Sequence, residues 1–174
     1  MKYTNSIPGW ISETDLQFLY DKAQEMESIV EIGSWLGRST HALLSGCSGL
    51  VNAVDNWQGI TDSTQNCTKE YADEHDVYNQ FLRNLLNVGH LNVYKMSSKE
   101  ASVFFEDKSI DMVFIDGDHI YEAVKQDIKL WLPKTKKLIC GHDYLTKWQG
   151  VVKAVNSLIG DVKTVDAIWY KEIK

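Results

Sequence analysis

Five acidic or imidazole side chains follow two apolar stretches of the chain, namely Asp116, Asp118, His119, His142 and Asp143. A histidine titrates near neutral pH and can take a proton from a hydroxyl group. Carboxylates are the oxygen ligands that hard divalent ions prefer. Helix capping accounts well for one acid after the first stretch, but less well for two acids and a histidine. The grouping therefore favours acid–base or metal-assisted chemistry.

A glycine-containing turn lies earlier in the chain, where the β-branched stretch 29–32 ends at Gly33 and a helical pattern begins at Ser39. Glycine allows positive φ and close approach of a ligand to the backbone. Free N–H groups at the start of a helix suit a carboxylate or a phosphate. Glu31 is unusual in an apolar stretch, because a buried carboxylate is costly unless a cationic ligand or backbone donors pair with it.

Alternating strand and helix patterns must position these groups. Strands are predicted at 29–32, 50–54, 93–96, 110–115 and 137–141, and helices at 12–27, 39–45, 68–87, 121–132 and 149–159. This alternation indicates an α/β fold with a parallel sheet between two helical layers. The last two strands, 162–165 and 167–170, have too short a connection for a parallel crossover, which predicts an antiparallel hairpin.

Polar residues follow the end of each predicted parallel strand, at Gly33, Asp55, Ser97, Asp116–His119 and His142–Asp143. Ligands of open parallel sheets bind outside the carboxyl ends of the strands. Each residue alone could cap a loop or pack in a turn. Together they predict a functional rim along one edge of the sheet.

Asp55 stands where an acid hydrogen-bonds the ribose in nucleotide-binding α/β proteins. A dinucleotide site requires Gly-x-Gly-x-x-Gly, but here Trp35 replaces the second glycine after Gly33. Its indole hinders close approach of a pyrophosphate. The pattern favours a nucleoside ligand without a phosphate over NAD.

Four segments together resemble a known family. Segment 31–40, Glu-Ile-Gly-Ser-Trp-Leu-Gly-Arg-Ser-Thr, resembles motif I of the class I S-adenosylmethionine-dependent methyltransferases, and 55–59 is similar to their ribose-binding motif. Segments 114–121 and 141–144 are similar to the motifs after strands four and five in a branch with small-molecule and sugar O-methyltransferases. The resemblance implies a Rossmann-like three-layer sandwich with a seven-stranded, mostly parallel sheet and an antiparallel C-terminal hairpin.

The resemblance also implies S-adenosyl-L-methionine as cofactor. It places the glycines of motif I against the methionine part, Glu31 near its amino-acid end and Asp55 on the ribose. Asn56 and Trp57 are expected beside the adenine, with Ser97 and Ser98 at its edge, where the family often has an acid that this chain lacks. The expected cofactor-binding residues are Glu31, Gly33, Ser34, Trp35, Leu36, Gly37, Ser39, Asp55, Asn56, Trp57, Ser97, Ser98, Asp116 and Gly117.

For the chemistry, the resemblance implies His119 as the catalytic base of an O-methyltransferase, with Asp116 and Asp143 as catalytic or metal-binding groups. Mg²⁺ would be held by Asp116, His142 and Asp143, and a softer divalent ion is an alternative. Trp57, Tyr144 and Trp148 either wall an acceptor pocket or simply pack. The acceptor site is expected from loop 57–67, the segment after Tyr144 and the N-terminal residues.

Length and composition are those of one soluble domain. The 174 residues carry a net charge of −6, which argues against nucleic-acid or anionic-membrane partners and leaves a small-molecule substrate. Three scattered cysteines without metal spacing and the absence of a signal-peptide pattern predict a cytoplasmic location. We expect a single domain, with a lead-in and helix over 1–27 and a cofactor-binding core over 28–174.

Two alternatives to a methyltransferase remain at this level. One is a nucleotide-dependent oxidoreductase, which Trp35 disfavours. The other is a non-catalytic domain of the same fold that binds only a cofactor or a partner. The identity of the acceptor is not encoded in any motif, because fold does not determine substrate.

Overall fold

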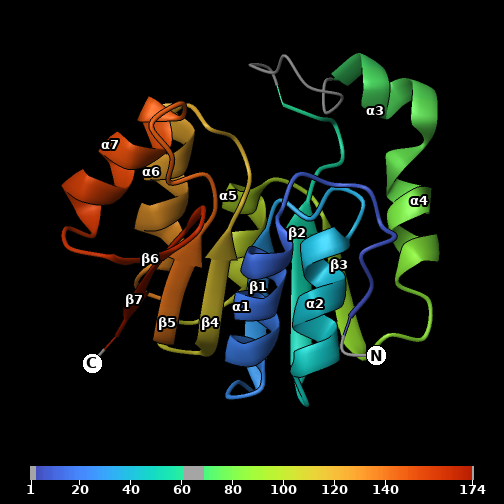
Figure 1. The fold of residues 1–174 in the computed structure, drawn as a ribbon, viewed down its shortest axis with the longest axis horizontal. Coiled ribbons are helices and arrows are strands. Elements are labelled where there is room, and N and C mark those ends of the chain that lie inside the picture. Colours follow the sequence, from blue (N-terminus) through green and yellow to red (C-terminus); the bar gives the residue numbers. More distant parts are fainter. Residues whose placement is uncertain (1–2, 61–68, 174) are drawn as a thin grey trace.

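The computed structural model describes residues 3–60 and 69–173, whose seven strands form one sheet in the order β3-β2-β1-β4-β5-β7-β6 (Figure 1). The strands are β1 (Ser28–Ile32), β2 (Leu50–Asp55), β3 (His90–Lys95), β4 (Ile110–Ile115), β5 (Thr135–Gly141), β6 (Lys163–Val165) and β7 (Ile168–Glu172). Strands β1 to β5 are parallel, whereas β7 is antiparallel to both β5 and β6. The predicted α/β class, the seven-stranded sheet and the terminal hairpin are therefore confirmed.

Helices cover both faces of the sheet and complete a three-layer sandwich. They are α1 (Glu13–Ala23), α2 (Arg38–Gly46), α3 (Lys69–His75), α4 (Val77–Asn84), α5 (Ser98–Ala101), α6 (Tyr121–Trp131) and α7 (Gln149–Leu158), with a 3₁₀ turn at Ser102–Phe104. In Figure 1, α1 and α2 lie in front of the sheet. Two apolar clusters form the core, one under α1, α2 and α4 and one under α5, α6 and α7.

The strands feed both clusters because their side chains alternate between the two faces. Phe114 on β4 packs into the first cluster, while its neighbours Val113 and Ile115 pack into the second. The central strand β4 is buried along its whole length. Such a strand reads as a continuous apolar run, which is why its sequence bounds were predicted correctly.

The single helix predicted over 68–87 is wrong within the described residues. It is broken into α3 and α4 by Asp76, whose φ is 47°. Aspartate tolerates this left-handed conformation because its short carboxylate can bond locally, and the Asn79 amide donates to Asp76 at 2.9 Å. An apolar face alone does not reveal such a break, because the spacing continues across it.

The N-terminal segment crosses the edge of the sheet where the parallel strands end. Ser12 caps α1 by accepting from the Asp15 N–H. The Arg38 guanidinium, at the start of α2, donates to the carbonyl groups of Asn5 and Ile7 at 2.8 Å each. This holds residues 5–11 over the carboxyl ends of the strands. Among the helices that the structure describes, none has the length and apolarity needed to cross a bilayer.

Candidate functional site

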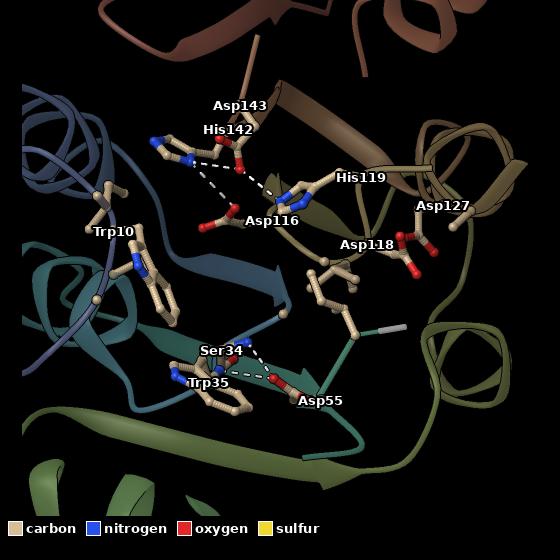
Figure 2. A pocket seen from close by; sticks show the side chains of 18 of the residues that line it. Trp10, Ser34, Trp35, Asp55, Asp116, Asp118, His119, Asp127, His142 and Asp143 are labelled. Atoms are coloured by element: carbon tan, nitrogen blue, oxygen red, sulfur yellow. Dashed lines mark hydrogen bonds and ion pairs between the residues drawn. The ribbon is translucent and has the colours of Figure 1, made fainter. Parts of the chain in front are cut away.

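A cavity of about 620 Å³ opens at the carboxyl ends of the parallel strands (Figure 2). The loops that follow β1, β2, β3, β4 and β5 all contribute to its lining, as do residues of the N-terminal segment such as Trp10. This is the edge where polar side chains were predicted to collect. The structure thus brings Asp55, Ser97, Asp116 and His142 to one cavity.

Asp55 organises the β1–β2 side of the cavity. Its Oδ2 accepts hydrogen bonds from the backbone N–H groups of Ser34 and Trp35, each at 2.9 Å, and its Oδ1 accepts from the Trp57 N–H at 2.7 Å. Burial raises the pKa of this carboxyl, while these backbone donors oppose the shift. An ionised carboxylate has about four acceptor positions, so Asp55 retains capacity for a further donor. It fixes the turn and still lines the cavity.

Gly33 is required by the packing of the sheet. Its φ is +86°, and a Cβ there would lie 2.2 Å from the backbone oxygen of Asp116. The absence of a side chain therefore lets the ends of β1 and β4 meet. Gly37, with φ +91°, faces the side chains of Leu85 and Phe81. Both glycines thus have packing roles, Gly33 also lines the cavity, and their expected contact with a cofactor stays a prediction.

Glu31 lies fully buried beneath the turn, at the end of the same strand. The Ser34 hydroxyl donates to its Oε2 at 2.7 Å, and the Thr40 hydroxyl donates to the same oxygen. Its Oε1 has no hydrogen-bond partner among the described residues. Burial raises the pKa of Glu31 to about 7, against the effect of the hydroxyl donors. Hydroxyl groups, rather than the expected backbone N–H groups, thus pair with one oxygen of this acid, and pairing with a cationic ligand stays a prediction.

The β4–β5 side carries a cluster of charged groups. His142 Nδ1 lies 3.5 Å from Asp116 Oδ1 and 3.3 Å from Asp143 Oδ2, as Figure 2 shows. Its Nε2 lies 3.3 Å from Asp15 Oδ2, on α1. Burial lowers the pKa of His142, but the three carboxylates outweigh it and raise the pKa to about 12. The cluster is built to hold positive charge between its carboxylates.

His119 joins this cluster from the loop after β4. Its Nε2 lies 2.8 Å from Asp143 Oδ2, and its ring packs against Trp148 with centroids 4.2 Å apart. Nδ1 is buried and has no hydrogen-bond partner among the described residues. Burial lowers the pKa of His119, but the Asp143 carboxylate outweighs this effect and raises it. The carboxylate also fixes the orientation of the ring, as an acid does for a histidine base.

Most predicted site residues line the cavity. The lining residues among them are Gly33, Ser34, Trp35, Leu36, Ser39, Asp55, Asn56, Ser97, Ser98, Asp116, Gly117, His119, His142 and Asp143. Glu31, Gly37 and Trp57 are not among the lining residues. The Trp57 ring is buried against Tyr78 and Phe81, and its Nε1–H donates to the Trp35 carbonyl.

The expected acceptor segments are also partly found at the cavity. Trp148 lines it, and the Tyr144 hydroxyl instead donates to Asn156 at 2.7 Å. Gly59 and Ile60 of loop 57–67 line the cavity, whereas residues 61–67 of that loop lie outside the described residues.

Sequence reasoning missed several residues of this site. Asp15 was interpreted only as part of a helix start, yet it is 1% exposed and contacts His142. Asp127, on α6, lines the cavity although nothing in its sequence neighbourhood marks it. Trp10 lines the cavity from the N-terminal segment while 51% exposed. The one available signal was the acid at Asp15 on an otherwise apolar helix face.

Comparison with known proteins agrees with this site. A family described as a methyltransferase domain matches residues 30–144 of the chain. A relative in Sinorhizobium fredii, named Uncharacterized protein y4gI, is 30% identical over 129 residues, which are 66% of this chain but 13% of that protein. The chain therefore corresponds to a small part of that relative.

Two solved structures share the fold over nearly the whole chain. The O-methyltransferase NovP has a TM-score of 0.70 and 17% identity, with 93% of this chain and 80% of NovP covered. The O-methyltransferase from Bacillus cereus in complex with SAH has a TM-score of 0.65 and 19% identity, with 97% and 84% covered.

The family match spans more than half of the chain. It contains the glycine turn at Gly33, Asp55 and the polar residues from Asp116 to Asp143. The chain belongs to the methyltransferase-domain family, and it shares the fold of the two solved O-methyltransferases. The oxidoreductase alternative is thereby set aside.

Proposed function

We propose that this protein transfers a methyl group to a hydroxyl oxygen of a small molecule such as a sugar, with His119 as base and a divalent ion held by Asp116, His142 and Asp143. The observation that carries the proposal is the cluster of these four side chains at one side of the cavity. Oxygen acceptors need their proton removed or its pKa lowered before transfer. Both solved O-methyltransferases named above have the same fold.

The donor set suits a metal ion. Ligand atoms of Asp116, His142 and Asp143 all lie within 4.8 Å of one another. The Nδ1–carboxylate distances of 3.5 and 3.3 Å exceed the roughly 2.7–2.9 Å of charge-assisted hydrogen bonds. They match the separation of ligand atoms that each lie about 2.0–2.2 Å from one ion, which is roughly 3.0–3.5 Å.

Asp15 supports the same interpretation from outside the donor set. A histidine ligand usually donates its other ring N–H to a carboxylate, which fixes its tautomer and orientation. Asp15 Oδ2 is 3.3 Å from His142 Nε2 and is itself held by the Ser12 hydroxyl at 2.9 Å. Because one donor is an imidazole, Mn²⁺ or Zn²⁺ fits this site better than Mg²⁺, which prefers oxygen ligands.

Each group of the chain then has a definite task. The cofactor supplies the methyl group as a sulfonium when bound, and a divalent ion would hold the acceptor oxygen and lower the pKa of its hydroxyl. Asp143 orients the His119 ring at the cavity wall, and the imidazole takes the proton of the acceptor hydroxyl. Asp55 fixes the turn at Ser34 and Trp35 in the cavity wall. A rigid wall aligns the methyl donor and the acceptor oxygen for in-line displacement.

The acceptor end of the cavity favours a small molecule with both polar and apolar faces. Trp10 and Trp148 contribute flat apolar surfaces, and Lys147 and Asp166 contribute opposite charges. Pockets of this size and mixed lining bind metabolites rather than macromolecular surfaces.

Calorimetry tests the proposal without knowledge of the acceptor. S-adenosylhomocysteine should bind with a micromolar dissociation constant, and Mn²⁺ should bind the wild type but not Asp116→Asn. Methyl transfer from labelled cofactor to a panel of sugars and other hydroxylated metabolites, followed by NMR of the product, identifies the acceptor atom. Absence of S-adenosylhomocysteine binding, or a methyl group found on nitrogen or carbon, would overturn the proposal.

The metal and the base have separate tests. Activity that survives EDTA unchanged would remove the metal from the mechanism. His119→Ala should abolish methylation while S-adenosylhomocysteine affinity persists, which would also exclude a non-catalytic domain. His119→Gln retains a donor to Asp143 but has no basic nitrogen, so it should be as inactive as His119→Ala.

A further inference from the structure

A hydrogen-bonded chain of three side chains lies in the cavity wall between α5 and α6. The Trp131 Nε1–H donates to Ser98 Oγ at 2.8 Å, and the Ser98 hydroxyl donates to Asp127 Oδ1 at 2.5 Å. An indole nitrogen can only donate. The single hydroxyl hydrogen of Ser98 is therefore directed to Asp127, and the carboxyl group must be an acceptor in this contact.

The second oxygen of Asp127 has no such partner. Among the described residues, none forms a hydrogen bond with Oδ2, although the residue is only 8% exposed and lines the cavity. Burial raises the pKa of Asp127 to about 6, and the nearby Asp118 charge adds to the effect. Oδ2 is not among the fully buried polar atoms that lack a partner, so a donor can reach it from the cavity that Asp127 lines. This oxygen is suited to accept from a ligand.

The surface beside Asp127 is shaped for a flat group. Gly117 lines the cavity, and a Cβ placed there would meet nothing nearer than 3.8 Å, with Asp127 Oδ2 and an Ile32 methyl as the nearest atoms. The backbone at Gly117 therefore leaves open space bounded by a carboxylate oxygen and an apolar side chain. A planar ring with an amino group at its edge fits these boundaries.

The direction of the cofactor follows from the charges around the cavity. The N–H groups of the turn at Ser34 and Trp35 already donate to Asp55. The N-terminus of α2, which begins at Arg38 and lines the cavity, suits the carboxylate of the amino-acid end. Asp127 would repel that carboxylate. In Figure 2, Asp127 and Asp118 lie across the cavity from Trp10, on the far side of Asp55 and His119. The nucleoside end is thereby directed toward Ser98 and Asp127.

We propose that Asp127 accepts, through Oδ2, a hydrogen bond from the exocyclic amino group of the cofactor's adenine, and so selects a 6-aminopurine. The inference rests on the proposed function, an S-adenosylmethionine-dependent methyl transfer. The loop after β3 supplies only Ser97 and Ser98 at this edge, and α6 supplies the carboxylate that this loop lacks. Asp127 is therefore a specificity residue on helix α6, where it belongs to no sequence motif and follows no strand.

A ligand pair tests this contact directly. S-adenosylhomocysteine and S-inosylhomocysteine differ in the group at position 6, which is an amino donor in the first and a carbonyl acceptor in the second. Calorimetry with the wild type should show at least about a ten-fold preference for S-adenosylhomocysteine. In Asp127→Asn the amide N–H₂ can face the carbonyl group, so the preference should disappear or reverse.

Two further variants make the result decisive. Glu122→Gln removes an exposed acid from the same helix α6, at a position that does not line the cavity, and should keep the wild-type preference. Circular dichroism and thermal melting confirm that each variant is folded. If Asp127→Asn were misfolded, Asp127→Glu, which retains the charge but displaces the oxygen, should lose most of the preference.

The outcomes separate this inference from the function on which it rests. A wild-type preference that Asp127→Asn leaves unchanged would overturn the role of Asp127. Equal affinity of the wild type for both ligands would also overturn it. Failure of the wild type to bind S-adenosylhomocysteine would instead overturn the proposed function.

Discussion

The two sides of the cavity satisfy their polar groups in different ways. On the β1–β2 side, Asp55 accepts three short hydrogen bonds from backbone N–H groups. On the β4–β5 side, His142 makes longer contacts of 3.3–3.5 Å to three carboxylates. His119 Nδ1 and Asp15 Oδ1 have no hydrogen-bond partners among the described residues. Backbone donors fix the first side, although Glu31 Oε1 beneath its turn also lacks a partner among the described residues, whereas contacts between side chains hold the second side.

This difference separates binding from chemistry. The β1–β2 side uses the backbone, so its geometry is set as soon as the sheet forms. The β4–β5 side uses side chains. Left-handed φ occurs on both sides, at Asp143 (58°) and at Trp35 (46°) and Trp57 (55°). Such conformations cluster at functional sites, where the surrounding structure holds them. Variants of the second side should therefore alter turnover, and variants of the first should alter stability and cofactor affinity.

Asp143→Asn should have the largest effect. Asparagine tolerates the same positive φ, so the backbone should be retained while the charge between His119 and His142 is lost. We expect kcat to fall roughly 10³-fold and S-adenosylhomocysteine affinity to change less than about three-fold. Steady-state kinetics with the acceptor from the panel and calorimetry check both values. A large loss of cofactor affinity would contradict the separation of the two sides.

Glu31→Gln should reveal the cost of the buried acid on the first side. The pKa of Glu31 is raised from 4.5 to about 7 in the folded state. The folded protein thus binds the extra proton, and its stability falls as pH rises from about 4.5 to 7. At about 1.4 kcal/mol for each pKa unit, the cost above pH 7 is about 3 kcal/mol.

The measurement is urea denaturation of the wild type and Glu31→Gln between pH 4.5 and 8. The wild type should lose stability relative to the variant as pH rises, because glutamine remains neutral and can still accept from the Ser34 and Thr40 hydroxyls. Taking the difference between the two proteins cancels the other titrating groups. A difference that does not change with pH would show that Glu31 titrates normally.

Asp15→Asn should weaken metal binding by roughly 10-fold, within the 10–100-fold range for residues that orient a ligand. It removes a charge next to His142 Nε2 without touching the donor set. Manganese affinity is measured by calorimetry. Asp21→Asn is the matched control, because Asp21 lies exposed on the same helix α1. Equal metal affinity in all three proteins would remove Asp15 from the site.

The sequence was sufficient for most of the fold. Mainly apolar runs identify the buried strands β1, β4 and β5, although charged residues such as Glu31 and Asp111 lie within them, and the short connection before β7 requires a hairpin. The interruption at Asp76 was not predictable, because it depends on a local backbone conformation rather than on apolar spacing. Polar residues at strand ends were located correctly for a simple reason. Parallel strands place their carboxyl ends at one edge.

The site was predictable only where it follows strand order. Asp116 and His142 come directly after strands, so topology brings them together. Asp15 and Asp127 come from helices, and their approach depends on how those helices pack. Trp57 was predicted beside the adenine because of its place in a motif, yet its ring is buried against α4. A motif fixes backbone position, while packing decides which way a side chain points.

Arg38→Met should have the smallest effect and should act on both sides at once. Arg38 donates to carbonyl groups of Asn5, Ile7 and Ile11, and so holds the segment that carries Trp10 over the cavity. Methionine retains the apolar stem but loses these bonds. We expect amide exchange in residues 5–11 to accelerate roughly 5–30-fold, equivalent to about 1–2 kcal/mol of local opening. Exchange within β1 and β4 should be unchanged.

Arg83→Met, at an exposed site on α4, is the control and should leave the segment protected. Equal protection in Arg38→Met would show that apolar packing, rather than the guanidinium, holds the segment in place.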